Sequence, residues 1–180
     1  MIYFTADLHL GHARIINYCH RPFKSAEEMD TAILANLYST LNRYDTLYIL
    51  GDISMSPNHA HRLLSLNKKD LKIHLIVGNH DRLDANLIKR FDSVSKLKDI
   101  NINGQKITLC HYAMRTWNCS AHGAWQLFGH SHGNLVAVGK QMDVGVDTHN
   151  FMPYSFDEIC EVMKTRGNNE DEGTKNIKEI

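Results

Sequence analysis

The histidines are the residues of this chain that most clearly suggest chemistry. There are 12 of them among 180 residues, and several stand beside Asp, Asn or Gly. Imidazole, carboxylate and amide groups together suit divalent transition metals such as manganese, iron, zinc, cobalt and nickel. These residue types are therefore suited to a metal site.

A short apolar strand followed at once by a possible metal ligand occurs five times. The five ends are Asp7-Leu8-His9 after IYFTA, Gly51-Asp52 after TLYIL, Gly78-Asn79-His80-Asp81 after HLIV, His111 after ITLC, and Gly129-His130-Ser131-His132 after WQLF. Ligands in open α/β sheets gather at the carboxyl ends of strands, so five such ends can converge on one crevice. The glycines before Asp52, Asn79 and His130 suit tight turns or a close approach of the backbone.

Each end also has an ordinary explanation. A Gly-Asp pair after a strand is commonly a turn or a helix cap. His130 and His132, however, are two residues apart and would share one side of an extended segment. Asp7 and His9 have the same spacing. Five coincidences at strand ends favour a single functional site.

The elements that must position these residues differ between the two halves of the chain. In the first half we expect strands at 2–6, 46–50 and 73–77, and helices at 25–42, 57–67 and 84–90. In the second half we expect short strands at 93–97, 106–110, 125–128 and 135–138, then a helix at 155–164. Ser25 with Glu28, and Ser155 with Glu158, form capping boxes. The order predicts a parallel β-α-β-α-β half and a mostly antiparallel half within one α/β sandwich.

Length and composition narrow the class of protein. The length fits one domain, residues 1–165, followed by a polar tail at 166–180 that we expect to be flexible. Twenty Lys and Arg balance twenty Asp and Glu, which argues against long duplex nucleic acid as a partner. Because no apolar run approaches the ~20 residues of a membrane span and the start lacks a secretory signal, we expect a cytoplasmic protein without a membrane partner. The oligomeric state stays open.

The order of the five blocks resembles the calcineurin-like metallophosphoesterases over about residues 1–150, and in particular their small single-domain bacterial and phage branch. The resemblance implies a four-layer αββα sandwich of the metallo-dependent phosphatase type with a dinuclear metal centre. It assigns the first ion to Asp7, His9 and His132, the second ion to Asn79, His111 and His130, and the bridge between them to Asp52. The cofactors would be two divalent transition-metal ions (Mn, Fe, Zn, Ni or Co), with manganese favoured.

The resemblance also suggests a catalytic histidine. It places His80 at the leaving-group oxygen, as a general acid or as a stabiliser of developing charge. Asp81 either orients that imidazole or caps the helix that begins near residue 83, and the sequence leaves both open. Candidates for binding substrate phosphate, or else ordinary surface residues, are His12, Arg14, Arg82 and Arg115.

The expected reaction is hydrolysis of a phosphodiester or phosphomonoester by attack of metal-bound hydroxide, with a phosphate-ester or nucleotide-like substrate. Two alternatives are a non-catalytic interaction scaffold on the same fold and a nuclease that acts on short nucleic acid. Tyr112, Trp117 and Trp125 could stack on a base, although core or rim packing is favoured for them. Asp143 and Asp147 are expected to support the ligand loops rather than to bind metal.

Overall fold

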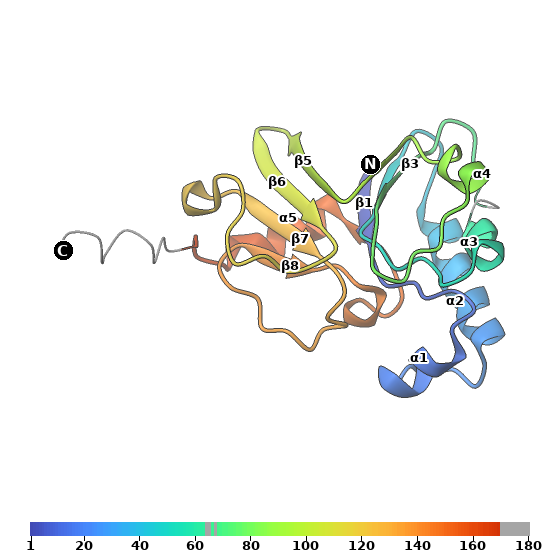
Figure 1. Cartoon of the computed structure of the whole chain (residues 1–180). Coiled ribbons are helices and arrows are strands. Elements are labelled where there is room, and N and C mark those ends of the chain that lie inside the picture. The colour runs from blue at the N-terminus through green and yellow to red at the C-terminus, as the bar shows by residue number, and fades with distance from the viewer. Residues whose placement is uncertain (64–65, 67, 170–180) are drawn as a thin grey trace.

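The computed structural model describes residues 1–63, 66 and 68–169, and two β-sheets form its centre (Figure 1). The first sheet has the strand order β4-β3-β2-β1-β9. Its strands are β1 (Ile2–Thr5), β2 (Thr46–Ile49), β3 (Lys72–Ile76), β4 (Ser93–Ser95) and β9 (Tyr154–Ser155). Strands β1 to β4 are parallel, and β9 is antiparallel to β1. The predicted parallel first half is therefore confirmed.

The second sheet has the order β5-β6-β7-β8. Its strands are β5 (Leu97–Ile102), β6 (Gln105–Cys110), β7 (Trp125–Phe128) and β8 (Gln141–Asp143). Only β5 and β6 are antiparallel, joined by the Asn103-Gly104 turn, whereas β6 with β7 and β7 with β8 are parallel. The prediction of a mostly antiparallel second sheet was wrong.

The reason is the long connection from β6 to β7, since parallel strands need a crossover of a dozen or more residues. Residues 111–124 supply this crossover, and a side-chain amide of β7 holds it on the sheet. Gln126 donates to the carbonyl of Tyr112 over 2.9 Å and accepts from the amide of Met114 over 3.1 Å. The buried Gln126 side chain thus stabilises the crossover connection, and β6 and β7 do not form a hairpin.

The strand predicted at 135–138 is not formed. Its side chains are exposed, Val136 at 87%, and the strand beside β7 is Gln141–Asp143 instead. β-branched residues favour strands mainly through packing against neighbours. Val136 has no such packing, so its propensity does not decide the structure.

The described helices are α1 (Ala13–Tyr18), α2 (Ala26–Thr40), α3 (Pro57–Leu63), α4 (Ala85–Ile88) and α5 (Phe156–Lys164), with 3-10 helices η1 (Ser120–His122) and η2 (Val146–Thr148). The predicted capping residues are in place: the Ser25 hydroxyl accepts from the Glu28 amide, and Ser155 and Glu158 form a capping box. Helices α2, α3, α4 and α5 confirm the predicted ones, while α1 was not predicted. Residues 64, 65 and 67 of the helix predicted at 57–67 and residues 170–180 of the predicted tail lie outside the described residues.

Side chains of the central parallel strands alternate between two cores. Tyr3, Leu47 and Ile73 face a cluster that includes Met29, Ile33 and Leu37 of α2. Their neighbours Phe4 and Ile76 face a second cluster with Ile107 and Leu109 of β6 and Ile159 of α5. The first sheet is therefore buried on both faces, between helices on one side and the second sheet on the other (Figure 1).

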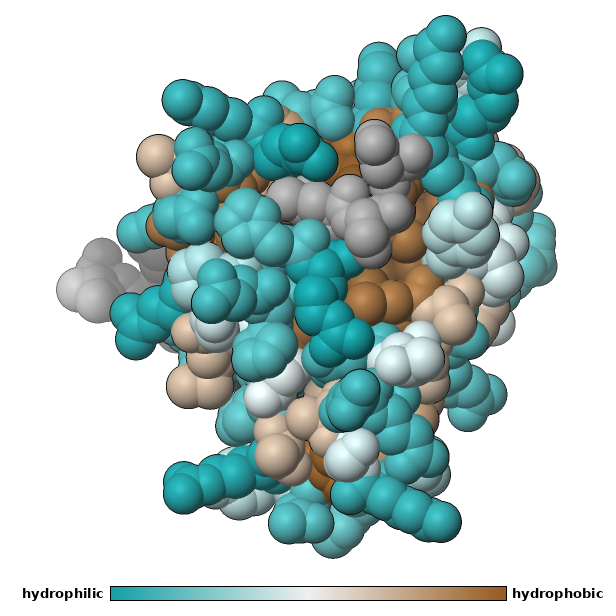
Figure 2. All heavy atoms as spheres, turned by 90° about the vertical axis from the view of Figure 1, so that its right-hand side faces the viewer, coloured by the Kyte–Doolittle hydropathy of each residue, from teal (hydrophilic) through white to brown (hydrophobic). Residues whose placement is uncertain are grey.

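The helical side of the molecule presents a mostly hydrophilic surface (Figure 2). Helix α2 buries Met29, Ile33 and Leu37, which are four residues apart and so share one face. Its opposite face carries exposed polar residues such as Glu27. This outer layer shields the first sheet and leaves the carboxyl ends of the strands as the place where loops gather.

Candidate metal centre

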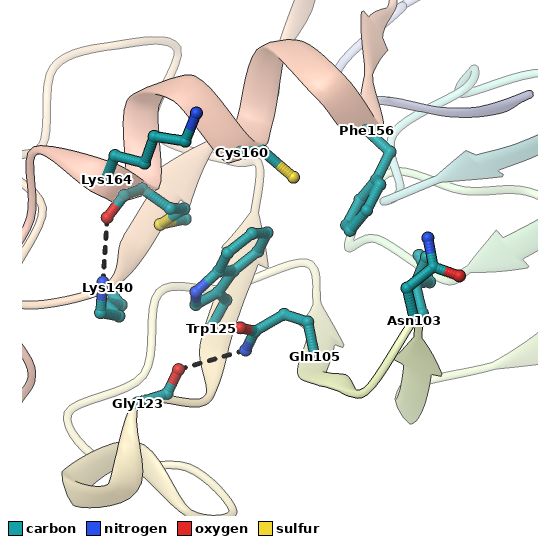
Figure 3. A pocket seen from close by; sticks show the side chains of 10 residues that line it. Asn103, Gln105, Gly123, Trp125, Lys140, Phe156, Cys160 and Lys164 are labelled. Atoms are coloured by element: carbon teal, nitrogen blue, oxygen red, sulfur yellow. Dashed lines mark hydrogen bonds between the residues drawn. The ribbon is translucent and has the colours of Figure 1, made fainter.

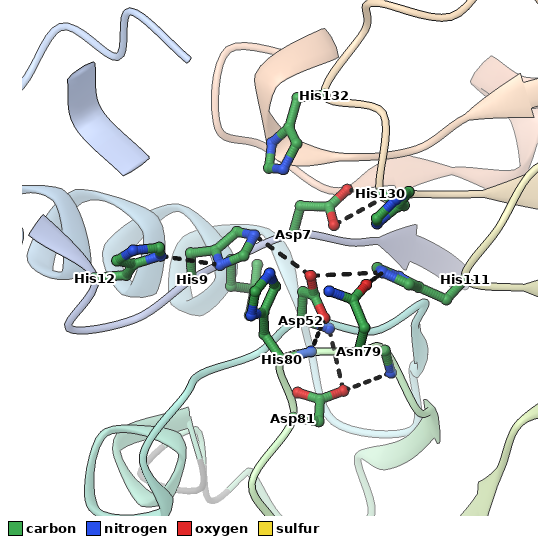
Figure 4. Close-up of polar contacts among 12 residues, drawn as sticks. Asp7, His9, His12, Asp52, Asn79, His80, Asp81, His111, His130 and His132 are labelled. Atoms are coloured by element: carbon green, nitrogen blue, oxygen red, sulfur yellow. Dashed lines mark hydrogen bonds and ion pairs between the residues drawn. The ribbon is translucent and has the colours of Figure 1, made fainter. Parts of the chain in front are cut away.

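The five predicted ligand segments meet where the two sheets adjoin (Figure 4). The carboxylate of Asp7, after β1, accepts from the amide of His130, after β7, at 3.0 and 2.8 Å. The ring of His111, after β6, donates from Nδ1 to the Leu50 carbonyl over 2.7 Å. Each contact links one sheet to the other. The predicted convergence is therefore present in the fold.

The ligand segments adopt a strained backbone. Five of the seven predicted ligands have positive φ: Asp7 (58°), His9 (49°), Asp52 (55°), His130 (67°) and His132 (49°). This region is uncommon for residues other than glycine. Each such residue costs roughly 1–3 kcal/mol, and such strain clusters at functional sites. The backbone geometry thus indicates a functional site at this edge of the sheets, and it does so independently of the side-chain chemistry.

Two glycines allow the segments to approach one another. A Cβ at Gly129 would lie 2.6 Å from the Ala6 Cβ and 2.8 Å from Asp7 Oδ2. Gly51 has φ of 91°, and a Cβ there would lie 2.7 Å from the backbone of Gly78. The close approach expected at these glycines is confirmed, because a side chain at either position would push two ligand loops apart.

The ligand atoms form two clusters joined by one carboxylate. Ligand atoms of Asp7, His9 and His132 lie within 4.8 Å of one another, and so do those of Asp52, His111 and His130. Asp52 Oδ2 is 3.5 Å from His9 Nε2 in the first cluster and 3.5 Å from His111 Nε2 in the second. Asn79 Oδ1 is 3.0 Å from His111 Nε2. Asp52 thus lies between the clusters, where a carboxylate can bridge two ions.

The donor atoms fit divalent metal ions. His9 Nε2 is buried and makes no hydrogen bond among the described residues, and an unsatisfied buried polar atom costs about 1–3 kcal/mol. Because His111 donates from Nδ1 to Leu50, its Nε2 carries a lone pair. A bound cation would satisfy both nitrogens.

Burial sets the protonation states of the same residues. It lowers the pKa of His9 to about 3, and nearby Asp52 opposes this only in part. Burial alone would raise the pKa of Asp52, but the nearby His111 imidazole and a hydrogen bond from the His80 amide lower it to about 2. A neutral imidazole and an ionised carboxylate are the forms that bind metal. Burial raises the pKa of Asp7 to about 7, a shift that an adjacent cation would reverse.

His80 lies at the rim of the two clusters, and Asp81 lies behind it (Figure 4). The His80 ring centroid is 5.4 Å from that of His9, and the His80 amide donates to Asp52 Oδ1 over 2.9 Å. The Asp81 carboxylate accepts from the amides of Asp52, Ile53 and Gly78 at 3.1, 2.8 and 2.8 Å. Asp81 therefore ties two ligand loops together.

The alternative in which Asp81 caps a helix was wrong. The residue at the N-cap of α4 is Asp84, which accepts from the amides of Asn86 and Leu87. Asp84 was missed because the capping signal was assigned three residues too early. The role of Asp81 as a partner of the His80 ring stays a prediction.

The four residues predicted to bind substrate differ in exposure. His12 is half-buried, and its Nδ1 lies 3.4 Å from His9 Nδ1. Arg14, Arg82 and Arg115 are exposed. The contact between His12 and His9 places that imidazole beside the first cluster. Their contacts with substrate stay predictions.

Of the three aromatic candidates, only Tyr112 lies at the site. Its hydroxyl donates to Asn79 Oδ1 over 3.3 Å. Trp117 is buried and donates to the Ala124 carbonyl. Trp125 lines a mostly apolar pocket of about 390 Å³ with Phe156 (Figure 3). That pocket lies where β6 and β7 begin, at the opposite end of the second sheet from the ligand segments. The favoured core and rim packing is confirmed for both tryptophans.

Sequence reasoning missed Arg21, which is 4% exposed. It donates to Asp147, to the Asp7 carbonyl and to the Leu8 carbonyl. Asp143 accepts from the Ser131 hydroxyl over 2.8 Å. Asp143 and Asp147 thus support the ligand loops as expected, whereas Arg21 stands in the sequence without a periodic or motif signal that could have identified it.

Comparison with known proteins now decides the family. The sequence profile described as calcineurin-like phosphoesterase matches residues 1–128. The chain belongs to this family. Its two sheets and flanking helices form the metallo-dependent phosphatase fold that the resemblance implied. The chemistry of this family is hydrolysis of phosphate esters with divalent metal ions.

Similar proteins span nearly the whole chain. The uncharacterized protein MJ1445 of Methanocaldococcus jannaschii is 31% identical over an alignment of 171 residues, which covers 91% of this chain and 91% of its own. The gene 66 protein of Mycobacterium phage L5 is 26% identical and covers 89% of this chain and 93% of its own. The crystal structure of AQ665, a protein of unknown function from Aquifex aeolicus, has a TM-score of 0.70 and 26% identity over 90% of this chain and 98% of its own.

The described helices include none that is long and apolar enough to cross a membrane.

Proposed function

We propose that this calcineurin-like phosphoesterase carries a dinuclear metal centre and hydrolyses phosphodiesters or phosphomonoesters. The observation that carries the proposal is the position of Asp52 Oδ2, 3.5 Å from one histidine nitrogen of each ligand cluster. Two separate mononuclear sites would not need a carboxylate at this midpoint. The proposed ligands of the first ion are Asp7, His9 and His132; those of the second are Asn79, His111 and His130; and Asp52 serves both.

The two ions would supply a Lewis acid and an activated water for in-line attack on phosphorus. The chain's own contribution is electrostatic. Asp7 and Asp52 are the only carboxylates among the seven proposed ligands, so they offset half of the charge of two divalent ions. The net positive charge that remains favours binding of phosphate oxygens. The mixed nitrogen and oxygen donors support a transition metal, with manganese as our first choice.

His80 is the proposed proton donor to the leaving group. Its half-buried ring stands beside His9 at the rim, and its amide is anchored on Asp52. An imidazole so placed can hold a proton close to an oxygen that departs from phosphorus, without being a metal ligand itself. Asp81 accepts from the Gly78 amide of the same loop as His80 and from the Asp52 amide of the neighbouring loop, and so holds the two loops together.

Exposure of the second cluster favours an accessible ester as substrate. Asn79 and His130 are exposed, whereas Asp7 and His9 are buried. A phosphate group can therefore approach from the side of the second cluster without displacing the core. We infer that the substrate is a phosphodiester or a nucleotide-like ligand. A balanced net charge argues against long duplex nucleic acid. A complete set of seven proposed ligands, five of them with a strained backbone, argues against a purely non-catalytic scaffold.

The test is hydrolysis of bis-p-nitrophenyl phosphate and p-nitrophenyl phosphate by metal-stripped protein titrated with Mn²⁺, Ni²⁺, Zn²⁺ and Mg²⁺. We expect metal-dependent turnover, faster with the diester, and two ions per chain. Asp52→Asn should abolish turnover and weaken binding of both ions.

Asp45→Asn is the matched control, because Asp45 is also a buried carboxylate but precedes β2 at the opposite end of the first sheet. It should change neither turnover nor metal content. Full activity in Asp52→Asn, or no turnover with two ions bound, would overturn the proposal.

A further inference from the structure

The Arg21 side chain is buried between elements that carry the first ligand cluster. Its Nε and Nη2 donate to the two carboxylate oxygens of Asp147, each over 2.7 Å. This is a bidentate fork, the strongest and most directional form of the arginine–carboxylate pair. The same guanidinium donates from Nη2 to the Asp7 carbonyl over 2.7 Å and from Nη1 to the Leu8 carbonyl over 3.1 Å.

Asp147 passes this restraint on to His132. Its Oδ2 lies 2.7 Å from His132 Nδ1, so the imidazole proton is on Nδ1 and Nε2 keeps its lone pair. Asp147 contacts Arg21 with both oxygens and His132 with Oδ2, so it is placed to orient the His132 imidazole. The positive charge of Arg21 is likewise matched by this carboxylate.

The first cluster therefore depends on one guanidinium through two routes. The backbone route runs through the carbonyls of Asp7 and Leu8, which belong to the two peptide groups that precede His9. The side-chain route runs through Asp147 to His132. The second cluster is held differently: His111 is bonded to the Leu50 carbonyl and Asn79 to the Tyr112 hydroxyl. Within the described chain, the polar contacts of Arg21 are with Asp7, Leu8, Met29 and Asp147, none of which is a ligand of the second cluster.

We propose that Arg21 and Asp147 are positioning residues for the first metal ion alone. This inference rests on the dinuclear function proposed above. It adds that the metal affinity of the first half-site (Asp7, His9 and His132) depends on two residues that touch no metal. The metal affinity of the second half-site (Asn79, His111 and His130) does not depend on them. Outer partners of metal-binding histidines typically change metal affinity by about 10–100-fold. We expect a loss of this size, confined to one of the two ions.

The experiment measures binding of Mn²⁺ by calorimetry without substrate, in backgrounds that isolate each half-site. His111→Ala removes a ligand of the second ion, and adding Asp147→Asn to it should weaken the remaining ion about 10–100-fold. His9→Ala removes a ligand of the first ion, and adding Asp147→Asn to that background should change nothing. In the otherwise native chain, Asp147→Asn should lose the spin-coupled Mn²⁺ signal at metal concentrations that saturate the unaltered protein.

Arg21→Lys tests the fork itself. A lysine keeps the charge but is a point donor that cannot engage both oxygens of Asp147 and two carbonyls, so it should not restore affinity for the first ion. Asp45→Asn measures the effect of any general loss of stability on metal binding. Equal weakening of both ions, or unchanged binding in every Asp147→Asn background, would overturn the inference while leaving the proposed function intact. A native chain that binds fewer than two ions would overturn both.

Discussion

The two half-sites differ in depth. In the first, Asp7 and His9 are buried and His132 is half-buried; in the second, His111 is buried while Asn79 and His130 are exposed. Burial lowers the pKa of His9 far more than it affects an exposed ring, because the charged form loses its hydration. The first half-site is therefore part of the core and the second is part of the surface, and Asp52 lies on the boundary between them.

The largest effect should come from breaking the buried half-site. His9→Ala removes the nitrogen that has no hydrogen-bond partner among the described residues, and we expect hydrolysis to be abolished and one ion per chain to be lost. Metal content is measured after gel filtration. His74→Ala is the control, since His74 is a half-buried histidine of β3 outside both clusters; a loss of metal there as well would contradict the assignment.

Next in size is the loss of the rim histidine, which belongs to neither half-site. His80→Asn should lower kcat by ~10²–10⁴ while both ions stay bound, because general acid catalysis contributes that much. The loss should be larger for an alkyl leaving group than for p-nitrophenolate, which departs without a proton. An equal loss for the two leaving groups would rule out proton donation by His80.

A smaller effect should follow from pushing the sheets apart where the half-sites adjoin. Gly129→Ala places a Cβ 2.6 Å from the Cβ of Ala6, and we expect a loss of about 1–3 kcal/mol in the free energy of unfolding. Urea denaturation measures it. Gly167→Ala is the matched control because a Cβ there meets nothing within 4 Å. Similar losses in the two variants would show that the approach of β1 and β7 is not tight.

The smallest effect should be at the exposed half-site. Tyr112→Phe removes one hydroxyl donor to Asn79, and we expect about 1 kcal/mol, or roughly fivefold, in the affinity of the second ion only. Calorimetric titration with Mn²⁺ detects this change. Tyr18→Phe, at another exposed tyrosine, should leave both affinities unaltered. A change in the first ion's affinity would instead mean that the half-sites are coupled through Asn79.

The site could be predicted from the sequence because its parts are local. Each ligand directly follows a strand, and the carboxyl ends of parallel strands meet by the geometry of the fold. Arg21 could not be predicted, because its partner Asp147 is 126 positions away and neither residue follows a strand. The amide contacts of Asp81 could not be predicted for a similar reason, since its carboxylate bonds to amides of the loop after β2 rather than to a helix that follows it.

The fold of the second sheet was harder to predict than that of the first. Short strands with turn residues between them favour hairpins, and Asn103-Gly104 is one. Nothing local to residues 111–124 shows that this segment crosses over the sheet, because Gln126 holds it through tertiary hydrogen bonds. The exposed run at 135–138 was assigned to a strand by propensity alone, and propensity yields to packing.

The left-handed backbone of the proposed ligands means that the stability of the apoprotein and metal binding favour different residues at the same position. His130 is exposed and has φ of 67°, a conformation that glycine adopts without cost. A chain with glycine there would be the sturdier apoprotein by up to roughly 1–3 kcal/mol, yet it would lack a proposed ligand. Stability of the apoprotein alone would therefore favour glycine at this position, whereas metal binding as proposed requires histidine.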